Sequence, residues 1–588
     1  MELSKNMRTW WQRDRLPLFL FLVATLAMTY PIVLRLDGRL LATFDTDTYV
    51  KLWDLWWMRR VLTSGETAYF TRELFFPGGL DLSFHSISWT VTGYALLLES
   101  FLPTLAAYNV TILTAVFLTG YAAYLLLLDL QATRLGAWLA GAVYTFAPYH
   151  LTHTGGHPDL THLAPIPIAV LFFLRAYQRP FSPKTWRYVV ATAVAIALAA
   201  YTSLYIFDFL VLTLLPLSLL VALQDGRWRN GRFWQITSVM GVVTAVLLLP
   251  RLWPILANGQ ALATAIEQKY IATAGQTDLR ALITPSHFNP LFGRWTQPIA
   301  DQFEMNKKWP AYLGLVPLLL AILSVIGAVV RRQQRQLRLT WLLMGLLFLL
   351  LALGPVLRMD GTVFAQIKLP AAYLADFPPI RAVGRPDFFI LGLLLALATL
   401  AGLGASDLHR FLLPKRPTWG VPLGLALGLL LLFEFWNGPY RMQPDQIPPF
   451  YETVAAEAGE FAIIDLPMGR QPSKQYVWRQ TAHNKPIVEG LSARTPPEAY
   501  NYIEANALLM RWRHGTPLDC ADLGAAGYET AVTQLLQDNF RIIILHKSST
   551  AVPEVEMGYF TAVPIYEDAQ IIVFDLATLA TDNPCAAR

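Results

Sequence analysis

The stretch LPLFLFLVATLAMTYPIVL, Leu16 to Leu34, is an apolar run without a single charged residue. Roughly 20 apolar residues are enough to cross the hydrocarbon core of a bilayer as a helix. A basic segment, MELSKNMRTWWQRDR, precedes the run, and no small-residue cleavage site accompanies it. The pattern predicts a retained signal-anchor helix with its N-terminus in the cytoplasm.

The composition of the whole chain agrees with this beginning. Hydrophobic residues make up 54% of the 588 residues and charged residues 15%, with a mean hydropathy of +0.40, which is too apolar for an ordinary soluble protein. The 18 Trp and 24 Tyr are residues that collect at bilayer interfaces. The net charge of +5 does not indicate nucleic acid, because Lys and Arg sit in short clusters between apolar runs. The sequence predicts a polytopic α-helical protein of the cell membrane.

About eleven apolar segments are candidates for membrane-spanning helices. The connections between them alternate: QATR, RPFSPKTWR, DGRWRNGR, RRQQRQLR and SDLHRFLLPKR are basic, and the short connections between those lack Lys and Arg. Basic loops resist translocation, so the alternation predicts which connections are cytoplasmic. It holds only if residues 87–103 form a juxtamembrane or re-entrant helix instead of a span. The predicted spans are 16–35, 107–129, 135–150, 160–178, 188–206, 207–223, 234–255, 311–330, 339–357, 387–404 and 419–437.

Two domains follow from this topology: a transmembrane domain, residues 1–437, with a long first outer loop at 36–106, and a soluble extracytoplasmic domain, residues 438–588. In the second domain the apolar segments EFAIIDLP, KPIVEGL, FRIIILHK and AQIIVFDL read as strands, with helical patterns between them. We therefore expect a C-terminal α/β domain. Both cysteines of the chain, Cys520 and Cys585, lie in it, so one disulfide is possible in an oxidising compartment.

The first candidate for chemistry is FDTDTYVKLWDLWW, Phe44 to Trp57, just beyond the first predicted span. Asp45 and Asp47 share one face of an extended chain. Two carboxylates there can bind a divalent cation or supply a general base. Equally, either aspartate can cap a helix whose tryptophans anchor it at the membrane surface.

The second candidate is YTFAPYHLTHTGGHPDLTHLAP, Tyr144 to Pro165, at the outer mouth between two predicted spans. Its histidines and its aspartate can ligate a metal or contact a phosphate. The alternative is a set of interfacial histidines bonded to headgroups and carbonyls. Zinc-like spacing is absent from the sequence. The residues concerned are His150, His153, His157, His162 and Asp159.

The third candidate is DFPPIRAVGRPDFF, Asp376 to Phe389, directly before a predicted span on the outer side. Arg381 and Arg385 lie where a lipid phosphate would be, and guanidinium groups suit bidentate phosphate contacts. Simple headgroup binding or snorkelling is the alternative. The sequence contains no G-x-S-x-G, H-E-x-x-H or P-loop motif, so hydrolase and ATPase functions lack support.

Together these features resemble the GT-C superfamily of polytopic membrane glycosyltransferases, which includes protein O-mannosyltransferases, aminoarabinose transferases and oligosaccharyltransferase catalytic subunits. The resemblance rests on the acidic pair Asp45 and Asp47, on GAWLAGAVYTFAPYHLTHTGGHPDL with its acidic residue Asp159, and on PPIRAVGRPDFF. It covers about residues 1–437. It implies transfer of a sugar from a polyprenyl-phosphate donor to an acceptor glycan, lipid or protein, at the outer face and with inversion. The histidine-rich turn differs from the usual acidic motif of metal-dependent members, which leaves the need for a divalent cation such as Mg²⁺ or Mn²⁺ open.

The resemblance also implies roles for individual residues. Asp45 would act as the base, with Asp47 second. Competing functions are a transporter or flippase of lipid-linked glycans and a non-catalytic scaffold with a binding outer domain; spans almost free of charge favour an interfacial enzyme. The residues expected at the donor phosphate are Arg381, Arg385, His153 and His157, and the expected metal ligands are Asp47, Asp159 and His157.

Overall fold

The computed structural model describes residues 2–41, 46–257, 275–330, 332, 334–412, 420–444, 447–547 and 554–586. The chain divides into two compact units. The first unit comprises Met1–Thr43, Ser88–Trp253 and Ile266–Gln443, and the second comprises Phe44–Ile87, Pro254–Ala265 and Pro444–Arg588. The sequence boundary between residues 437 and 438 stays a prediction; the second unit also contains residues 44–87, from the predicted first outer loop.

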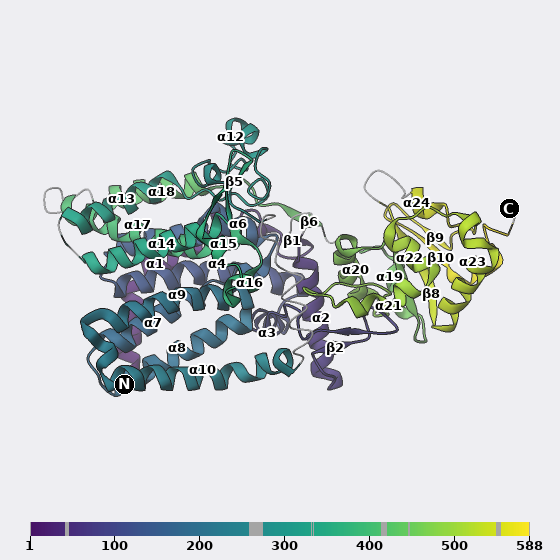
Figure 1. The fold of residues 1–588 in the computed structure, drawn as a ribbon, viewed down its shortest axis with the longest axis horizontal. Coiled ribbons are helices and arrows are strands. Elements are labelled where there is room, and N and C mark those ends of the chain that lie inside the picture. Colours follow the sequence, from purple (N-terminus) through teal and green to yellow (C-terminus); the bar gives the residue numbers. More distant parts are fainter. Residues whose placement is uncertain are drawn as a thin grey trace. The chain divides into compact units, whose positions relative to one another are not determined.

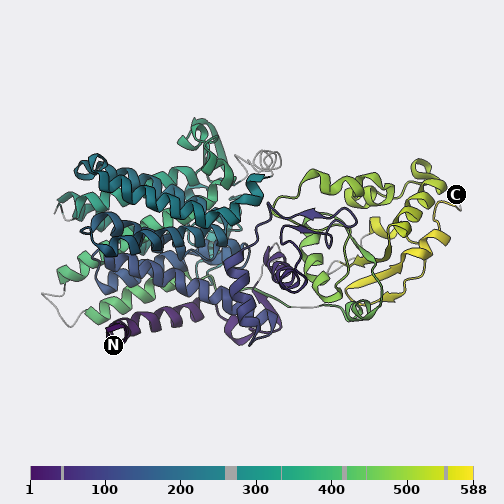
Figure 2. The ribbon, with the colours of Figure 1, turned by 90° about the horizontal axis from the view of Figure 1, so that it is seen from below.

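The first unit is a helical bundle whose long helices run side by side (Figures 1 and 2). Among the described residues, seven helices are long and apolar enough to cross a membrane, and each overlaps a predicted span. The number of eleven spans stays a prediction. The seven helices are α4 (Thr104–Asp129), α7 (Pro165–Gln178) with the preceding 3-10 turn η2 (Pro158–Leu160), α8 (Pro183–Thr202), α9 (Leu204–Leu223), α10 (Gly231–Ala257), α14 (Arg335–Ala352), and α17 (Ile390–Leu412) with η5 (Pro386–Phe389).

Shorter or less apolar helices complete the bundle. The segment predicted to be juxtamembrane contains an 11-residue helix, α3 (Trp89–Glu99), which at 1.5 Å per residue is too short to cross a bilayer. The others are α1 (Glu2–Met28), α5 (Arg134–Phe146), α13 (Leu315–Val330) and α18 (Gly420–Phe435).

Helix α17 lies at the centre of the first unit and is buried along its apolar span. Glycines allow its neighbours to approach closely: a Cβ on Gly136 of α5 would come within 2.2 Å of the Gly402 carbonyl oxygen. A Cβ on Gly404 would come within 1.9 Å of the Leu320 carbonyl oxygen on α13. Lipid gives helices no hydrophobic reason to associate, so close backbone packing through small residues is a main source of their cohesion.

The second unit contains a four-stranded sheet with the strand order β7-β8-β10-β9. Strands β7 (Ala462–Leu466) and β8 (Phe540–His546) are parallel, whereas β10 (Ile571–Asp575) and β9 (Tyr566–Glu567) run antiparallel. Three of the four predicted strands are therefore present. The prediction for KPIVEGL was wrong, because this segment contributes only an isolated bridge between Ile463 and Ile487.

Residues 48–64 of the predicted first outer loop form helix α2 (Thr48–Ser64), which packs against α20 (Arg470–His483) within the second unit. The indole N–H of Trp53 donates to Gln480 Oε1 at 2.8 Å, and that of Trp56 donates to Asn484 Oδ1 at 3.0 Å. The tryptophans of this helix thus contact protein, not only a membrane surface.

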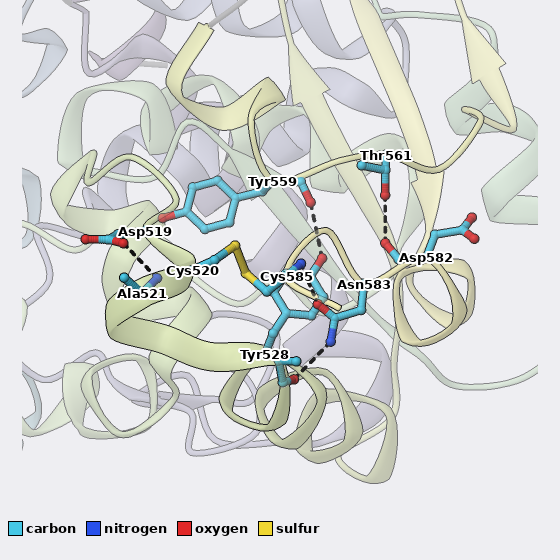
Figure 3. The surroundings of a disulfide bond; sticks show 10 residues. Asp519, Cys520, Ala521, Tyr528, Tyr559, Thr561, Asp582, Asn583 and Cys585 are labelled. Carbon is cyan, nitrogen blue, oxygen red and sulfur yellow. Dashed lines mark hydrogen bonds between the residues drawn. A yellow bond between two sulfur atoms is a disulfide. The ribbon is translucent and has the colours of Figure 1, made fainter. Parts of the chain in front are cut away.

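A disulfide joins Cys520, the first residue of α23 (Cys520–Gln537), to Cys585 near the end of the chain (Figure 3). The Asn583 amide also donates to the Ala525 carbonyl oxygen at 2.9 Å, so the C-terminal segment is fastened to α23 by a covalent and a polar contact.

Candidate functional site

The histidine-rich turn is shaped by one proline and two glycines. Helix α5 ends at Phe146, and Pro148 begins the short helix α6 (Pro148–Thr154), as expected for a proline at the first helical position. Gly155 and Gly156 follow α6, and His157 then precedes η2. His153 in the last turn of α6 and His157 after the glycines are thereby brought to the same place.

Trp309 packs against both histidines. Its ring centroid lies 4.3 Å from that of His153 and 4.9 Å from that of His157. Gly156 makes this possible, because a Cβ at that position would lie 2.1 Å from a carbon of the Trp309 ring. Tyr149 also packs against His153, with 4.3 Å between the two ring centroids.

Arg385 belongs to the same cluster. Its guanidinium binds Asp387 through two hydrogen bonds, Nε to Oδ1 at 3.1 Å and Nη2 to Oδ2 at 2.7 Å, and its Cζ lies 4.4 Å from the Phe388 ring centre. The Tyr149 hydroxyl donates to the same carboxylate at 2.9 Å. Asp387 is fully buried, while one fifth of the Arg385 side chain is exposed. Phe388 also contacts His153 and His157, at ring distances of 5.8 and 6.1 Å.

His153 is a neutral imidazole in this setting. Burial, followed by the nearby His157 and Arg385, lowers its pKa well below the ordinary value. Its Nδ1 is 2.8 Å from the Tyr149 carbonyl oxygen, so the proton sits on Nδ1. Nε2 is then an acceptor, and it is buried with no hydrogen-bond partner among the described residues. A neutral His153 offers a phosphate no second donor, so its predicted phosphate contact would require protonation.

Asp159 lies in η2, where its Oδ1 accepts a 2.6 Å hydrogen bond from the Ser88 hydroxyl at the start of α3. Arg381 lies in α16 (Pro378–Val383), with a side chain that is one third exposed and a distant partner, Asp376 Oδ1, at 3.9 Å. His150 contacts two backbone carbonyls, those of Thr145 and Thr161, which indicates a structural role.

Asp45 lies outside the described residues. Asp47 immediately precedes α2, but its side chain makes no capping hydrogen bond to that helix. Its Oδ1 instead lies 3.0 Å from Lys474 Nζ of α20. The cap interpretation is thus not realised for Asp47, and its role as a catalytic residue stays a prediction.

The sequence analysis did not identify a buried ionic network between α2 and His85. Asp54 Oδ1 lies 2.7 Å from His85 Nε2 and Asp54 Oδ2 lies 3.2 Å from Lys51 Nζ, with all three side chains almost fully buried. The Ala493 N–H donates to His85 Nδ1 at 3.2 Å. Burial acts to raise the pKa of Asp54, but Lys51, followed by His85 and the hydrogen bonds to both, holds that pKa below its ordinary value. We assign this network to the stability of the second unit.

No group of three His, Cys, Asp or Glu side chains in the described part of the chain is arranged to hold a metal ion. The predicted metal ligands Asp47, Asp159 and His157 contact Lys474, Ser88 and Trp309, respectively, and their role as ligands stays a prediction. We assign no metal-dependent step to these residues.

Comparison with known proteins places this geometry in context. A family model described as Domain of unknown function (DUF6311) matches residues 94–413. A search of curated proteins found no match.

Solved structures are similar in fold across nearly the whole chain. The oligosaccharyltransferase AglB from Archaeoglobus fulgidus, in complex with an inhibitory peptide and a dolichol-phosphate, is 12% identical, with a TM-score of 0.51 over 91% of this chain and 70% of that one. ArnT from Cupriavidus metallidurans, bound to undecaprenyl phosphate, is 13% identical, with a TM-score of 0.51 over 95% of this chain and 97% of that one. The arabinofuranosyltransferase AftD from Mycobacteria is 14% identical, with a TM-score of 0.54 over 96% of this chain and 41% of that one. The chain has the fold of the GT-C membrane glycosyltransferases.

Proposed function

The chain belongs to the DUF6311 family, and from its GT-C fold we propose that it is a membrane glycosyltransferase. It would move a sugar from a polyprenyl-phosphate donor to an acceptor glycan, lipid or protein on the extracytoplasmic face. Similar folds in the proteins above bind dolichol-phosphate and undecaprenyl phosphate. Identity of 12 to 14% extends the fold to this chain, and the reaction is our proposal.

One observation carries the proposal: Arg385, partly exposed at the beginning of a membrane helix, is fixed in orientation by a buried carboxylate. A guanidinium whose orientation is already fixed by Asp387 loses little entropy when it binds a phosphate, and its planar geometry suits phosphate oxygens. Arg381, four residues earlier and with only a distant partner, would contribute a second positive charge. The pair would neutralise the phosphate as it leaves the sugar.

In the proposed reaction, Asp45 orients and deprotonates the acceptor hydroxyl, with Asp47 as the second carboxylate. The new bond forms between the acceptor oxygen and the anomeric carbon, while the bond from that carbon to the phosphate oxygen breaks. The acceptor proton passes to Asp45, and the electron pair leaves with the polyprenyl phosphate. Attack opposite the leaving group inverts the anomeric centre. His157 and Asp159 would border the donor.

The proposal includes the topology predicted from the sequence: eleven spans, a cytoplasmic N-terminus, and residues 438–588 on the outer side as an α/β domain. The Cys520–Cys585 disulfide supports that side, because disulfides persist in oxidising compartments.

The test uses the full chain in proteoliposomes with a panel of radiolabelled polyprenyl-phosphate sugars and a cell-envelope extract as acceptor. Loss of a positioned base typically costs 10²–10⁴-fold, so Asp45→Asn is expected to lose at least about 100-fold of transfer. Glu529→Gln is the control, because Glu529 is exposed on α23 and has no part in the proposed site. Equal transfer by Asp45→Asn and the wild type would refute the base. Movement of the donor between leaflets without any transfer would indicate that the protein is a flippase and not a glycosyltransferase.

A further inference from the structure

A β-hairpin in the first unit exposes apolar side chains where an ordinary outer loop would expose polar ones. Strands β4 (Val356–Met359) and β5 (Thr362–Lys368) form a separate two-stranded sheet. Asp360 and Gly361, both with positive φ, make the turn, as Asp-Gly does in tight hairpins. In Figure 1, β5 and the neighbouring short helices lie at one end of the bundle helices.

Polar contacts hold the turn of the hairpin. The carboxylate of Asp278 accepts from the backbone N–H groups of Asp360 and Gly361, at 3.2 and 2.8 Å. Arg280 pairs with Asp360, and Arg358 of β4 pairs with Glu304. The hairpin thus has a defined position in the first unit, although its second strand is exposed.

Three apolar residues of β5 are exposed, and we call them the hairpin face: Val363, Ala365 and Ile367. Val363 is 41% exposed and Ile367 is 42% exposed. The residues between and beside them are Thr362, Phe364, Gln366 and Lys368, of which Phe364 alone is apolar, and it is half-buried. A two-stranded hairpin is marginally stable in water unless one face is covered, so an uncovered apolar face calls for a partner.

The position of the hairpin in the chain indicates that this partner is the membrane. Helix α14 ends at Ala352, and β4 begins four residues later at Val356. The hairpin therefore begins at most about 14 Å from the end of a membrane-spanning helix. After β5 the chain continues through the short helix α15 (Pro370–Tyr373) and α16 to a second spanning helix. The hairpin therefore lies in the connection between two membrane-length helices and directly follows the first of them.

The residues that follow β5 have the composition of an interfacial anchor. Tyr373 is 77% exposed, and Leu374 and Phe377 are also exposed. Exposed aromatic and aliphatic side chains beside a cation such as Lys368 match the boundary between headgroups and acyl chains. The free edge of β5 leaves backbone groups without ladder partners, which excludes the dry hydrocarbon core but is tolerated where water is present.

We propose that residues 356–377 lie in the headgroup layer of the bilayer, with the hairpin face turned toward the acyl chains. The occupant of this surface is the membrane itself. The segment leads directly to Arg381 and Arg385, so it would position that region at the depth of lipid phosphates. The inference requires membrane insertion of the first unit and does not depend on the proposed reaction.

The test places single cysteines on the two faces of β5 in the full chain, labels them with an environment-sensitive fluorophore and reconstitutes the protein in phosphatidylcholine vesicles. The native cysteines are paired in a disulfide, so labelling without reductant targets the new site. Quenchers are attached to the acyl chains of the lipid. We expect quenching at Val363→Cys and Ile367→Cys to exceed that at Thr362→Cys and Gln366→Cys by about twofold or more, since alternate strand residues point to opposite faces.

Leu343→Cys, on an exposed position of the spanning helix α14, is the positive control for lipid contact. The same four hairpin variants measured with a water-soluble quencher should show the reverse order. Equal quenching of both faces by lipid would overturn the proposed orientation. Protection of Ile367→Cys from both quenchers would show that protein covers the hairpin face, and would overturn the proposal as a whole.

Discussion

Asp387 is the residue on which the geometry of Arg385 depends. Its carboxylate is fully buried and holds both the guanidinium of Arg385 and the hydroxyl of Tyr149. Burial of a carboxylate is tolerated where a charged partner and hydrogen bonds satisfy its oxygens, and here both oxygens are satisfied.

Asp387→Asn should therefore loosen Arg385. Hydrogen bonds to charged groups contribute about 1.5–3 kcal/mol, so the free energy of unfolding is expected to fall by about 2 kcal/mol. If Arg385 binds the donor phosphate, the KM for the donor should rise more than kcat falls. Denaturant unfolding in detergent micelles and a donor titration measure the two effects. Glu529→Gln, at an exposed position of α23, should leave both unchanged. An Asp387→Asn variant with unchanged stability and unchanged donor KM would show that Asp387 does not position Arg385.

At this scale the sequence predicts some members of the cluster and not others. His153 and His157 stand out because histidines are dense in one short turn, and Arg385 because it precedes a span. Trp309 and Asp387 carry no such local pattern; only the folded chain brings them to the histidines. The neutral state of His153 likewise follows from its burial and its bond to the Tyr149 carbonyl, which no sequence pattern encodes.

Among the helices, α14 and α17 are joined by a buried ion pair. Arg338 donates to both oxygens of Asp407, at 2.6 and 2.9 Å, and to the Ser324 carbonyl oxygen of α13 at 2.9 Å. Removing one partner leaves an unpaired buried charge, so Arg338→Leu should cost about 3–5 kcal/mol.

The double variant Arg338→Leu with Asp407→Leu should recover most of this loss, because no buried charge remains. Unfolding of the two single variants and the double variant in detergent completes a double-mutant cycle. Additive losses would show that the two side chains stabilise the helices independently.

Helix α20 of the second unit ends in a buried histidine that should make local stability depend on pH. Nδ1 of His483 accepts the Lys485 N–H at 3.0 Å, so this nitrogen cannot take a proton without losing that bond. Burial lowers the pKa of His483 to about 4, although the nearby Asp465 opposes this. The stabilisation is present above the ordinary histidine pKa of about 6.5 and is lost as the pH falls through about 4.

Wild type should lose about 3 kcal/mol relative to His483→Asn between pH 7 and pH 4, from a difference of roughly 2.5 pKa units. Burial raises the pKa of Asp465 to about 6, which acts in the opposite direction; because His483 is among the groups that lower that pKa, the comparison is repeated with Asp465→Asn in both proteins. Hydrogen exchange of peptides from β7 and α20 measures the loss in the full chain. His514→Asn, at an exposed histidine, should follow the wild type; parallel profiles for wild type and His483→Asn would contradict the assignment.

The helices could be predicted from the sequence where one physical cause dominates. Seven apolar runs became membrane-length helices because a bilayer demands continuous apolar surface, and the 87–103 segment gave a helix too short to span. KPIVEGL failed because an apolar pattern alone does not supply a neighbouring strand; beyond Ile487 its residues make no further pairing in the described sheet.

For the whole molecule, the pattern of residues 44–87 indicates a loop of the membrane domain, yet the compact unit that contains them includes the C-terminal sheet. Trp53 and Gln480, which form a hydrogen bond, are 427 residues apart in the sequence, and no local periodicity predicts a contact between residues so far apart. Helix α2, which follows the predicted acidic pair in the sequence, is thus part of the second unit.

The disulfide of the second unit indicates on which side of the membrane this unit folds, because disulfides persist in oxidising compartments. Cys520 and Cys585 are 65 residues apart, and closing a loop of this size stabilises a fold by about 4 kcal/mol in the chain-entropy model. If the unit is exported, the protein in intact cells should show no thiol reactive toward a maleimide polymer until a reductant is added.

Cys520→Ser with Cys585→Ser should then lower the denaturant midpoint of the second unit while the first unit keeps its own. Lys184→Cys, in a basic connection predicted to be cytoplasmic, is the control: it should react with a membrane-permeant maleimide and resist an impermeant one. Free native thiols in the folded, unreduced protein would place the second unit in a reducing compartment. The predicted orientation of every span would then have to be reversed, because eleven spans place the N-terminus and the second unit on opposite sides of the membrane.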